Sequence, residues 1–563
     1  MSAVRPVGTL RIPARIRRRG KGDGGYLATA FALAALVAMP FVALVWLALS
    51  GSSSNWSHLA TTILPEASIV TAQLMLGVAL VTGTVGAVTA WLVASFEFPG
   101  RRFFSWALVL PLAVPTYIAA YCFVEFLHFA GPVQSAIRAV FGYKSSRDYW
   151  FPEIRSLPGA VLILSSVLYP YVYLTVRMVF LMQGRKAAEV ARTLGASQAA
   201  IFAKILLPLA RPAIAVGVTL ALMEAVNDIG AVEFLGVRTL TFAIYSTWLN
   251  RGDLYGATQI ALLMLAVILV LVAVERLARR RQRFTLGRAD RPQPGSERLT
   301  GGKAALASLA CAMPIILGFA IPFLVLGDYA VRRLDQLADP QLWRALRHTV
   351  ALASITSLAT VLAGFMLAYG VRLTGSRRLV LMTRLAVIGY AVPGTVLAIG
   401  ILIPLAGLDN FVDAHMRAGF DVSTGLVLSG SGFAIVYAGF VRFMAMGHGS
   451  LESGFAKVSP HLDMASRTLG RTPGATLLEV LLPLMRPALL TAFLLVFVEA
   501  SKELSATILL RPFDFETLAT FVYAQTSRSA FEDGAVAALL IVLVGILPVA
   551  ILNRSILAET TRS

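Results

Sequence analysis

Two pairs of carboxylic acids lie inside otherwise apolar stretches of the chain. Glu224 and Asp228 stand four residues apart in one stretch. Glu499 and Glu503 have the same spacing in a later one. Residues with this spacing share one face of an α-helix, and a charge at the centre of a membrane-spanning helix costs about 2.5–3.5 kcal/mol, so such acids are functional candidates by default. Four carboxylates around one axis would suit a hard trivalent cation, which prefers oxygen ligands.

Neighbouring polar residues leave two interpretations of these acids open. Lys502 lies three residues after Glu499, close enough on a helix to neutralise it. Glu224 could instead hydrogen-bond a neighbouring helix, because buried charges often serve structural pairs. Asn227 and Ser501 lie on the same turns and favour a polar path through the protein. A structural role and a role in such a path therefore both stay open.

Other chemistry is poorly represented in the sequence. The two cysteines, Cys122 and Cys311, lie in apolar stretches, and no two of the six histidines stand three or four residues apart. The sequence therefore predicts no disulfide framework, no certain metal site and no cofactor. It has neither a GxxxxGK[ST] phosphate loop nor a nucleophile elbow, so we expect a chain that is not an enzyme and has no nucleotide site of its own.

The composition assigns most of the 563 residues to a lipid environment. Hydrophobic residues make up 57% of the chain and charged residues 14%, and mean hydropathy is +0.75, whereas a soluble globule carries about 25% charged residues. A spanning helix needs about 20 apolar residues. We expect an all-α, polytopic membrane protein with about 12 transmembrane helices. The expected spans are 27–49, 74–94, 104–124, 159–176, 213–235, 257–274, 304–327, 349–370, 385–406, 424–441, 488–510 and 535–552.

The basic residues that give the chain its net charge of +19 are clustered at the ends of spans. Clusters precede the first span and follow the second, sixth and eighth. All four fall on one side if the N-terminus is cytoplasmic, as the positive-inside rule requires. The excess charge thus marks a cytoplasmic face against anionic lipid, and no nucleic-acid partner is expected. The clusters are Arg5 to Lys21, Arg101 and Arg102, Arg276 to Arg283, and Arg372 to Arg378.

The two halves of the chain repeat one another. The run ARTLG at 191–195 recurs as SRTLG at 466–470, and ILLPLARPA at 205–213 recurs as VLLPLMRPA at 480–488, both 275 residues later. An even number of spans returns the chain to the same side, so two six-helix repeats would be parallel. We expect a basic cytoplasmic tail at 1–25, a first transmembrane repeat at 26–281, a cytoplasmic linker at 282–302 and a second transmembrane repeat at 303–563.

A polar segment between the fourth and fifth spans of each half is expected to form a helical elbow on the cytoplasmic face. The two elbows are residues 183–212 and 452–487. In the first elbow, Gly195 permits the positive φ that ends one short helix, Ser197 caps the next helix, and Pro208 ends it. A compact elbow on the membrane face is suited to docking a partner.

The elbows resemble the EAA loop of ABC importer permeases, in which an EAA triplet is followed at fixed spacing by a glycine and then by Leu-Pro. The first elbow matches with Glu189-Val190-Ala191, with Gly195 and with Leu207-Pro208. The second elbow matches at Gly470 and at Leu482-Pro483. The resemblance implies that both elbows couple the chain to an ATPase. The coupling residues would be Glu189, Ala191, Gly195, Pro208, Asp463, Gly470 and Pro483.

The second elbow departs from the pattern at its front. Met464-Ala465-Ser466 stand where the triplet is expected, and the acid, Asp463, lies one place early. We therefore expect two docking sites that are not equivalent.

A narrower resemblance covers nearly the whole chain. Residues 228–245 and 502–520 are similar to the fused, two-halved permeases of ferric-iron ABC importers. The resemblance implies a type I importer fold in a bacterial inner membrane. It also implies two partners, a periplasmic ferric-binding protein and a cytoplasmic ABC ATPase, expected to be a homodimer. Glu224, Asp228, Glu499 and Glu503 would line the translocation path, which alternates between the two faces as the ATPase moves the elbows.

Other cargoes and another energy source remain alternatives. Permeases for thiamine, polyamine or phosphonate share the EAA loop, and acidic path residues would suit cationic solutes other than iron as well. An ion-coupled secondary transporter also fits two parallel halves, although it does not predict a repeated elbow. The outward segment 125–158 is long enough to contact a binding protein, but an ordinary variable loop is equally compatible with its sequence.

Overall fold

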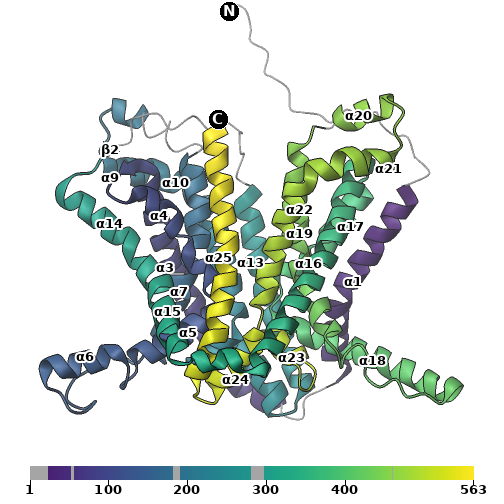
Figure 1. The fold of residues 1–563 in the computed structure, drawn as a ribbon, viewed down its shortest axis with the longest axis horizontal. Coiled ribbons are helices and arrows are strands. Elements are labelled where there is room, and N and C mark those ends of the chain that lie inside the picture. Colours follow the sequence, from purple (N-terminus) through teal and green to yellow (C-terminus); the bar gives the residue numbers. More distant parts are fainter. Residues whose placement is uncertain (1–22, 52–55, 182–189, 281–296, 460, 563) are drawn as a thin grey trace, which may run out of the picture.

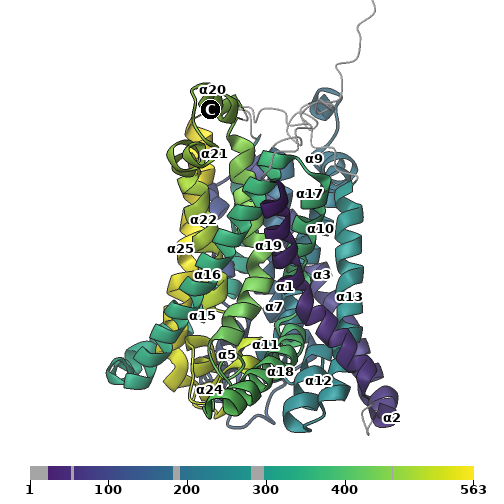
Figure 2. The ribbon, with the colours of Figure 1, turned by 90° about the vertical axis from the view of Figure 1, so that its right-hand side faces the viewer.

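The chain folds into one long helical bundle in the computed structural model, which describes residues 23–51, 56–181, 190–280, 297–459 and 461–562 (Figures 1 and 2). Two short strands are present in these ranges, β1 (Phe96–Glu97) and β2 (Glu297–Arg298), and they pair in parallel with Phe96 opposite Glu297. The expectation of an all-helical membrane protein is confirmed in this coarse sense.

Residues 23–280 supply helices of very different lengths. Three π-helical turns, η1 (Leu59–Ile63), η4 (Phe202–Leu206) and η5 (Ser246–Asn250), and one 3₁₀ turn, η2 (Leu110–Ala113), adjoin them. The helices are α1 (Asp23–Ser50), α2 (Trp56–His58), α3 (Leu64–Ser95), α4 (Arg101–Ala107), α5 (Thr116–Leu127), α6 (Pro132–Phe141), α7 (Leu157–Val179), α9 (Gln198–Ile201), α10 (Leu207–Asn227), α11 (Ile229–Phe234), α12 (Leu240–Tyr245) and α13 (Leu254–Arg280).

Residues 297–562 supply a second series in similar order. The adjoining turns are η6 (Ile316–Ala320) and η9 (Leu477–Leu481), which are π-helical, and η7 (Leu334–Ala338) and η8 (Ile388–Ala391), which are 3₁₀. The helices are α14 (Gly301–Ile315), α15 (Ile321–Arg332), α16 (Pro340–Thr374), α17 (Arg377–Ala386), α18 (Gly394–Phe420), α19 (Phe433–Lys457), α20 (His461–Thr468), α21 (Pro473–Thr476), α22 (Leu482–Ser501), α23 (Thr507–Leu510), α24 (Leu518–Ser527) and α25 (Phe531–Arg562).

Among the described residues, fewer helices are long and apolar enough to cross a membrane than the twelve we expected. In the described ranges nine helices are long and apolar enough, and the bent pair α4–α5 would make ten. The expected span 424–441 is displaced, because α19 begins only at Phe433 and contains Arg442, His448 and Glu452. Several expected spans are interrupted rather than straight.

Prolines account for two of these interruptions. The segments on either side of Val114-Pro115 are bent by 94°. Pro115 stands just before α5, and Pro393 stands just before α18 in the same way. Since the residue before a proline is driven to extended backbone, Val114 and Val392 both leave the helical conformation. The expected spans 104–124 and 385–406 are therefore each broken into a short and a long piece.

The first helix of each half packs against helices of the other half. Helix α1 packs against α17 and α18 of the second half, and α15 packs against α5 of the first half as well as against α25 of its own half. In Figure 1 α1 accordingly lies among the green helices of the second half, and α14 and α15 lie beside the helices of the first half. Such an exchange makes the core continuous between the two halves of the chain.

An equivalent long-range hydrogen bond is present in each half. The backbone N–H of Leu240 donates to Oγ1 of Thr71 at 2.9 Å, and that of Leu518 donates to Oγ1 of Thr349 at 2.8 Å. Both bonds span 169 residues. The repeated motifs of the sequence thus correspond to repeated contacts in the fold.

The two ends of the bundle differ in what they carry. The short helices of both elbows, α9 and α20–α21, lie at the upper end in Figure 1. Helix α6, α24 and the C-terminal part of α18 lie at the opposite end. Since α1 meets α2 at that lower end in Figure 2, α1 begins at the end that carries the elbows.

Candidate functional site

The carboxylates predicted to share helix faces lie where their helices end. Helix α10 stops at Asn227, and Asp228 caps the next helix, α11, by accepting the N–H of Ala231 at 3.0 Å. The expected span 213–235 is therefore wrong as a single helix. Glu224 and Asp228 do not share a helix face, because a short acidic side chain that captures backbone N–H groups favours a new helix start over continuation.

The second half breaks in the same way. Helix α22 ends at Ser501, and the Glu503 carboxylate accepts the N–H groups of Ala506 at 3.0 Å and of Thr507 at 3.1 Å. It also accepts the Thr507 hydroxyl at 2.9 Å. The expected span 488–510 is thus also interrupted, and Glu499 and Glu503 lie on different segments.

All four acids nevertheless face one cavity between the two halves. Glu224 and Asp228 line it from one side and Glu499 and Glu503 from the other. The oxygen Oδ2 of Asp228 is buried there and makes no hydrogen bond among the described residues. The breaks in α10 and α22 bring the acids together, because they turn the carboxylates and several backbone groups toward the centre of the bundle.

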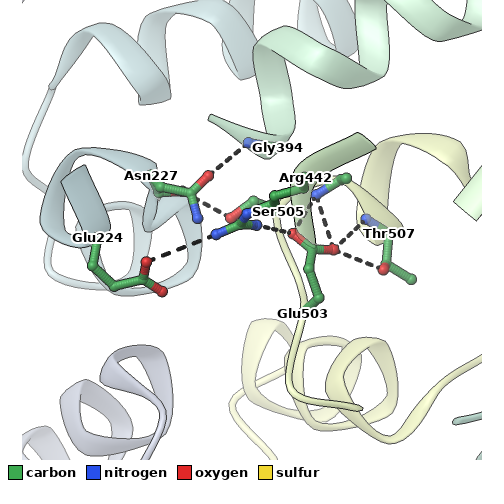
Figure 3. Close-up of polar contacts among 8 residues, drawn as sticks. Glu224, Asn227, Gly394, Arg442, Glu503, Ser505 and Thr507 are labelled. Carbon is green, nitrogen blue, oxygen red and sulfur yellow. Dashed lines mark hydrogen bonds and ion pairs between the residues drawn. The ribbon is translucent and has the colours of Figure 1, made fainter. Parts of the chain in front are cut away.

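Two cations lie in the same cavity. Arg442, from α19, bonds Glu503 through Nη1 at 2.7 Å, and its Nη2 lies 3.8 Å from Glu224 (Figure 3). Lys502 pairs with Glu499 at 2.9 Å, as the spacing of these two residues allowed. Four carboxylates thus face two cations, which leaves an excess of two negative charges when every group is ionised.

Arg442 is the residue that sequence reasoning missed. Its side chain is only 9% exposed, and its guanidinium contacts an acid from each half. An arginine in the middle of the apolar run 433–447 was the available signal, since an unpaired charge is rare at such a place. The expected span 424–441 ends one residue before Arg442.

Asn227, at the end of α10, forms hydrogen bonds with two segments of the second half. Its Oδ1 accepts the N–H of Gly394 at 2.6 Å, and its carbonyl oxygen accepts the hydroxyl of Ser505 at 2.8 Å (Figure 3). A Cβ at Gly394 would lie 2.7 Å from the backbone nitrogen of Ala506. The absence of a side chain at Gly394 therefore allows the start of α18 to approach the two breaks.

Within the described ranges, no group of three or more His, Cys, Asp and Glu side chains is arranged to hold a metal ion. The acids are instead held by Arg442, by Lys502 and by backbone N–H groups. The arrangement can attract a cation by its excess negative charge without enclosing it.

The turns of the two elbows have the geometry that the glycines predicted. Gly195 has φ +82° and Gly470 has φ +80°. In each elbow the next residue donates its N–H to the carbonyl five residues back, at 3.0 Å for Ala196 and 3.1 Å for Arg471, which closes the end of the preceding helix. Ser197 caps α9 through the N–H of Ala200 at 3.3 Å, which confirms the predicted cap.

The prediction that Pro208 ends the elbow helix is wrong. Helix α9, the π turn η4 and α10 run on without leaving helical backbone, and Pro208 lies in the first turn of α10. Pro483 likewise lies in the first turn of α22, which follows η9 directly. A π turn before each proline accommodates its missing N–H, so each elbow continues directly into the long helix that reaches the cavity.

The acids at the front of the elbows differ between the halves. Glu189 lies outside the described residues, while the neighbouring Ala191 is buried. Asp463, on α20, is bound by Nε of Arg372 at 2.9 Å. Arg372 also donates to the carbonyls of Phe455 and Val458, each at 3.0 Å. Asp463 therefore holds the second elbow against the end of α16.

Comparisons with known proteins agree with this architecture. Residues 83–284 match the family described as binding-protein-dependent transport system inner membrane component. The Fe(3+)-transport system permease protein FbpB 2 of Haemophilus influenzae is 24% identical over 86% of this chain and 88% of its own length. A probable sulfate transport system permease, cysT of Nephroselmis olivacea, is 29% identical over 42% of this chain and 81% of its own. The molybdenum transport system permease ModB of Escherichia coli K12 is 26% identical over 36% of this chain and 88% of its own.

Proposed function

We propose that this chain, which belongs to the family of binding-protein-dependent transport system inner membrane components, forms the translocation path for ferric iron in a bacterial ABC importer. It is a multi-pass inner-membrane permease and a non-catalytic component. The family implies that a binding protein delivers the cargo and that a separate ATPase supplies the energy. We place the N-terminus in the cytoplasm, on the side of the elbows, because the basic clusters at Arg101 and Arg377 begin helices near that end.

The observation that carries this proposal is the meeting of four carboxylates at the breaks of α10 and α22. A hard trivalent cation prefers oxygen ligands, and the cavity offers them with an excess of negative charge. The likeness to the ferric-iron permease extends over 86% of the chain, whereas the likenesses to the sulfate and molybdenum permeases cover 42% and 36%. The share of the chain covered by the likeness and the carboxylate oxygens of the cavity together favour iron as the cargo and a permease with two fused halves.

The elbows would transmit force to this cavity. An ATPase pair that closes under the two elbows would draw α9 and α20–α21 toward each other. Since each elbow continues into α10 or α22 without a break at the proline, its displacement would tilt that whole helix. Both helices end at the cavity, so the tilt would separate Glu224 from Arg442 and expose the carboxylates to one face at a time.

An oxyanion is the second candidate cargo. Two of the relatives are named as sulfate and molybdenum permeases, and Arg442 and Lys502 are the kinds of residue that bind such anions. The cavity contains twice as many carboxylates as cations, and both cations are paired with acids, which favours a cationic cargo.

Uptake measurements with matched variants test the proposal. Glu224 and Glu499 are the better exposed acids of the cavity, at 26% and 23%, so a Glu224→Gln/Glu499→Gln variant disturbs folding least. Glu66→Gln, on the surface of α3, is the matched control. We expect radioactive iron uptake by vesicles containing the assembled importer to fall at least tenfold in the double variant and to stay normal in the control.

Two outcomes would contradict the proposal. Normal iron uptake by a fully assembled double variant would make the carboxylates structural. Uptake of sulfate or molybdate but not iron by the unaltered importer would establish the second candidate instead.

A further inference from the structure

Two lateral arms extend from the lower end of the bundle on opposite sides (Figure 1). The first arm, residues 128–150, consists of α6 and the loops around it. The second arm, residues 408–429, consists of the C-terminal part of α18 and the loop that follows. Neither arm takes part in the cavity or in the elbows, which lie at the centre and at the other end.

The polar side of the first arm is closed on its own loops. Gln134 donates to the carbonyl of Leu127 at 2.7 Å and accepts the hydroxyl of Tyr149 at 2.6 Å. Arg138 donates to the carbonyl of Phe129, and its guanidinium lies 4.0 Å from the centre of the Phe129 ring. The polar groups of α6 are therefore satisfied within the arm.

The other side of α6 is apolar and uncovered. Its apolar residues recur with the period of one helix face, and Val140 and Phe141 at its end are 77% and 67% exposed. Trp150, beyond the loop, is 86% exposed. The residues of this face are Val133, Ala136, Ile137, Val140 and Phe141.

The second arm has the same construction with different residues. Asp409 accepts the N–H groups of Leu428 at 2.9 Å and Ser429 at 2.7 Å, and Asp413 accepts those of Thr424 at 2.8 Å and Gly425 at 3.0 Å. Its polar face is thus also turned toward its own loop. The opposite face of the helix presents Leu408, Phe411 and Val412, all exposed.

We propose that both arms lie in the outer membrane–water interface, with their apolar faces against the acyl chains and their self-bonded polar faces toward the headgroups. Amphipathic helices with a polar face and bulky apolar residues bind lipid in this way, and Trp and Tyr gather at the same depth. The lipid surface is the occupant because the arms point in opposite directions from the bundle. A single binding protein seated on the end of the bundle cannot cover both faces, whereas the bilayer adjoins the bundle on each side.

The arms would fix the depth of the permease in the membrane. Helix α6 follows α5, and the second arm continues α18 directly. Both α5 and α18 begin beside the cavity, α5 directly after Pro115 and α18 at Gly394. An anchored arm therefore holds the outer ends of these two helices while the elbow ends move.

Fluorescent labelling of neighbouring positions tests the proposal. Cys122 and Cys311 are fully buried, so a single added cysteine can be labelled selectively in the full chain. Val140→Cys and Phe411→Cys place a fluorophore on the apolar faces. Ala139→Cys and Asn410→Cys are the matched controls, because these exposed neighbours point away from the apolar faces. The permease is reconstituted in phosphatidylcholine–phosphatidylglycerol nanodiscs, with nitroxide-labelled lipid or aqueous iodide as quencher.

We expect nitroxide lipid to quench the two apolar-face labels at least threefold more than the controls, and iodide to show the reverse order. Strong iodide quenching at all four positions with no lipid quenching would overturn the proposal, because the arms would then stand in water. Protection from iodide that appears only when a binding protein is added would also overturn it, in favour of a protein-docking surface.

Discussion

Removal of the Arg442 guanidinium is the most direct test of how the cavity is held together. In an Arg442→Gln variant, Glu503, whose side chain is 8% exposed, would lose its 2.7 Å partner inside the bundle. Breaking a buried ion pair from one side costs about 3–5 kcal/mol, because an uncompensated charge stays behind. Glu503 keeps hydrogen bonds from Ala506 and Thr507, which favours the lower end of this range. About 3 kcal/mol corresponds to slightly more than a 100-fold change in the folding equilibrium.

The assay is thermal unfolding of the purified protein in detergent, followed by the loss of the monodisperse peak in gel filtration. We expect Arg442→Gln to lower the apparent melting temperature clearly and an Arg442→Met/Glu503→Gln double variant to recover most of the loss, since the double change removes both charges. Arg332→Gln is the control, because Arg332 pairs with Asp328 at 2.8 Å on the surface, where such pairs contribute about 0–1 kcal/mol. An unchanged melting temperature in Arg442→Gln, or strictly additive losses in the double variant, would refute the pairing.

Three further predictions follow from other positions in the structure. Gly470→Ala should uncouple ATP hydrolysis from uptake by the assembled importer, because φ +80° is strained for alanine. Arg372→Gln and Asp463→Asn should each weaken coupling, and their combination should be no worse than Arg372→Gln alone, because both break one ion pair of 2.9 Å. Gly394→Ala should lower the melting temperature, because its Cβ would lie 2.7 Å from a backbone nitrogen that is held in place.

Glycine-to-alanine changes at two other positions serve as controls, because they reduce backbone flexibility without strain or a steric clash. Gly474 lies in the same elbow as Gly470, and Gly407 lies on the same helix as Gly394; an added Cβ meets nothing within 4 Å at either control position. Gly474→Ala and Gly407→Ala should therefore behave like the unaltered chain. Equal losses in a glycine and its control would contradict the backbone argument, and additive losses at Arg372 and Asp463 would contradict the ion-pair argument.

Local chemistry made much of the architecture predictable. Long apolar runs identified the long helices, and glycine at 195 and 470 predicted turns that the structure confirms. The repeat of the elbows also predicted that Glu224 and Glu499 would be related, and both line one cavity. These features depend on residues close together in sequence, where periodicity and backbone preference dominate.

The sequence analysis did not predict the helix breaks, because hydrophobicity does not show where a polar side chain binds backbone N–H groups and so ends one helix and starts another. Residues 213–235 are apolar enough for one helix, but Asp228 satisfies backbone N–H groups of α11 and so starts a new one. The contact of Arg442 with Glu503 spans 61 residues, and the exchange of α1 between halves spans several hundred. Such contacts depend on how the helices pack, which no local pattern contains.

The two repeated halves therefore differ in the charges that they place at the cavity. Counting back from Arg442 by the 275 residues that relate the elbows leads to Val167, which lines the same cavity without a charge. A single guanidinium thus serves acids from both halves, at 2.7 Å from Glu503 and 3.8 Å from Glu224. The longer contact is the weaker one, since the energy of a charge pair falls with distance. When the halves separate, Arg442 should remain with Glu503, so the first half would present Glu224 and Asp228 to the cargo unpaired.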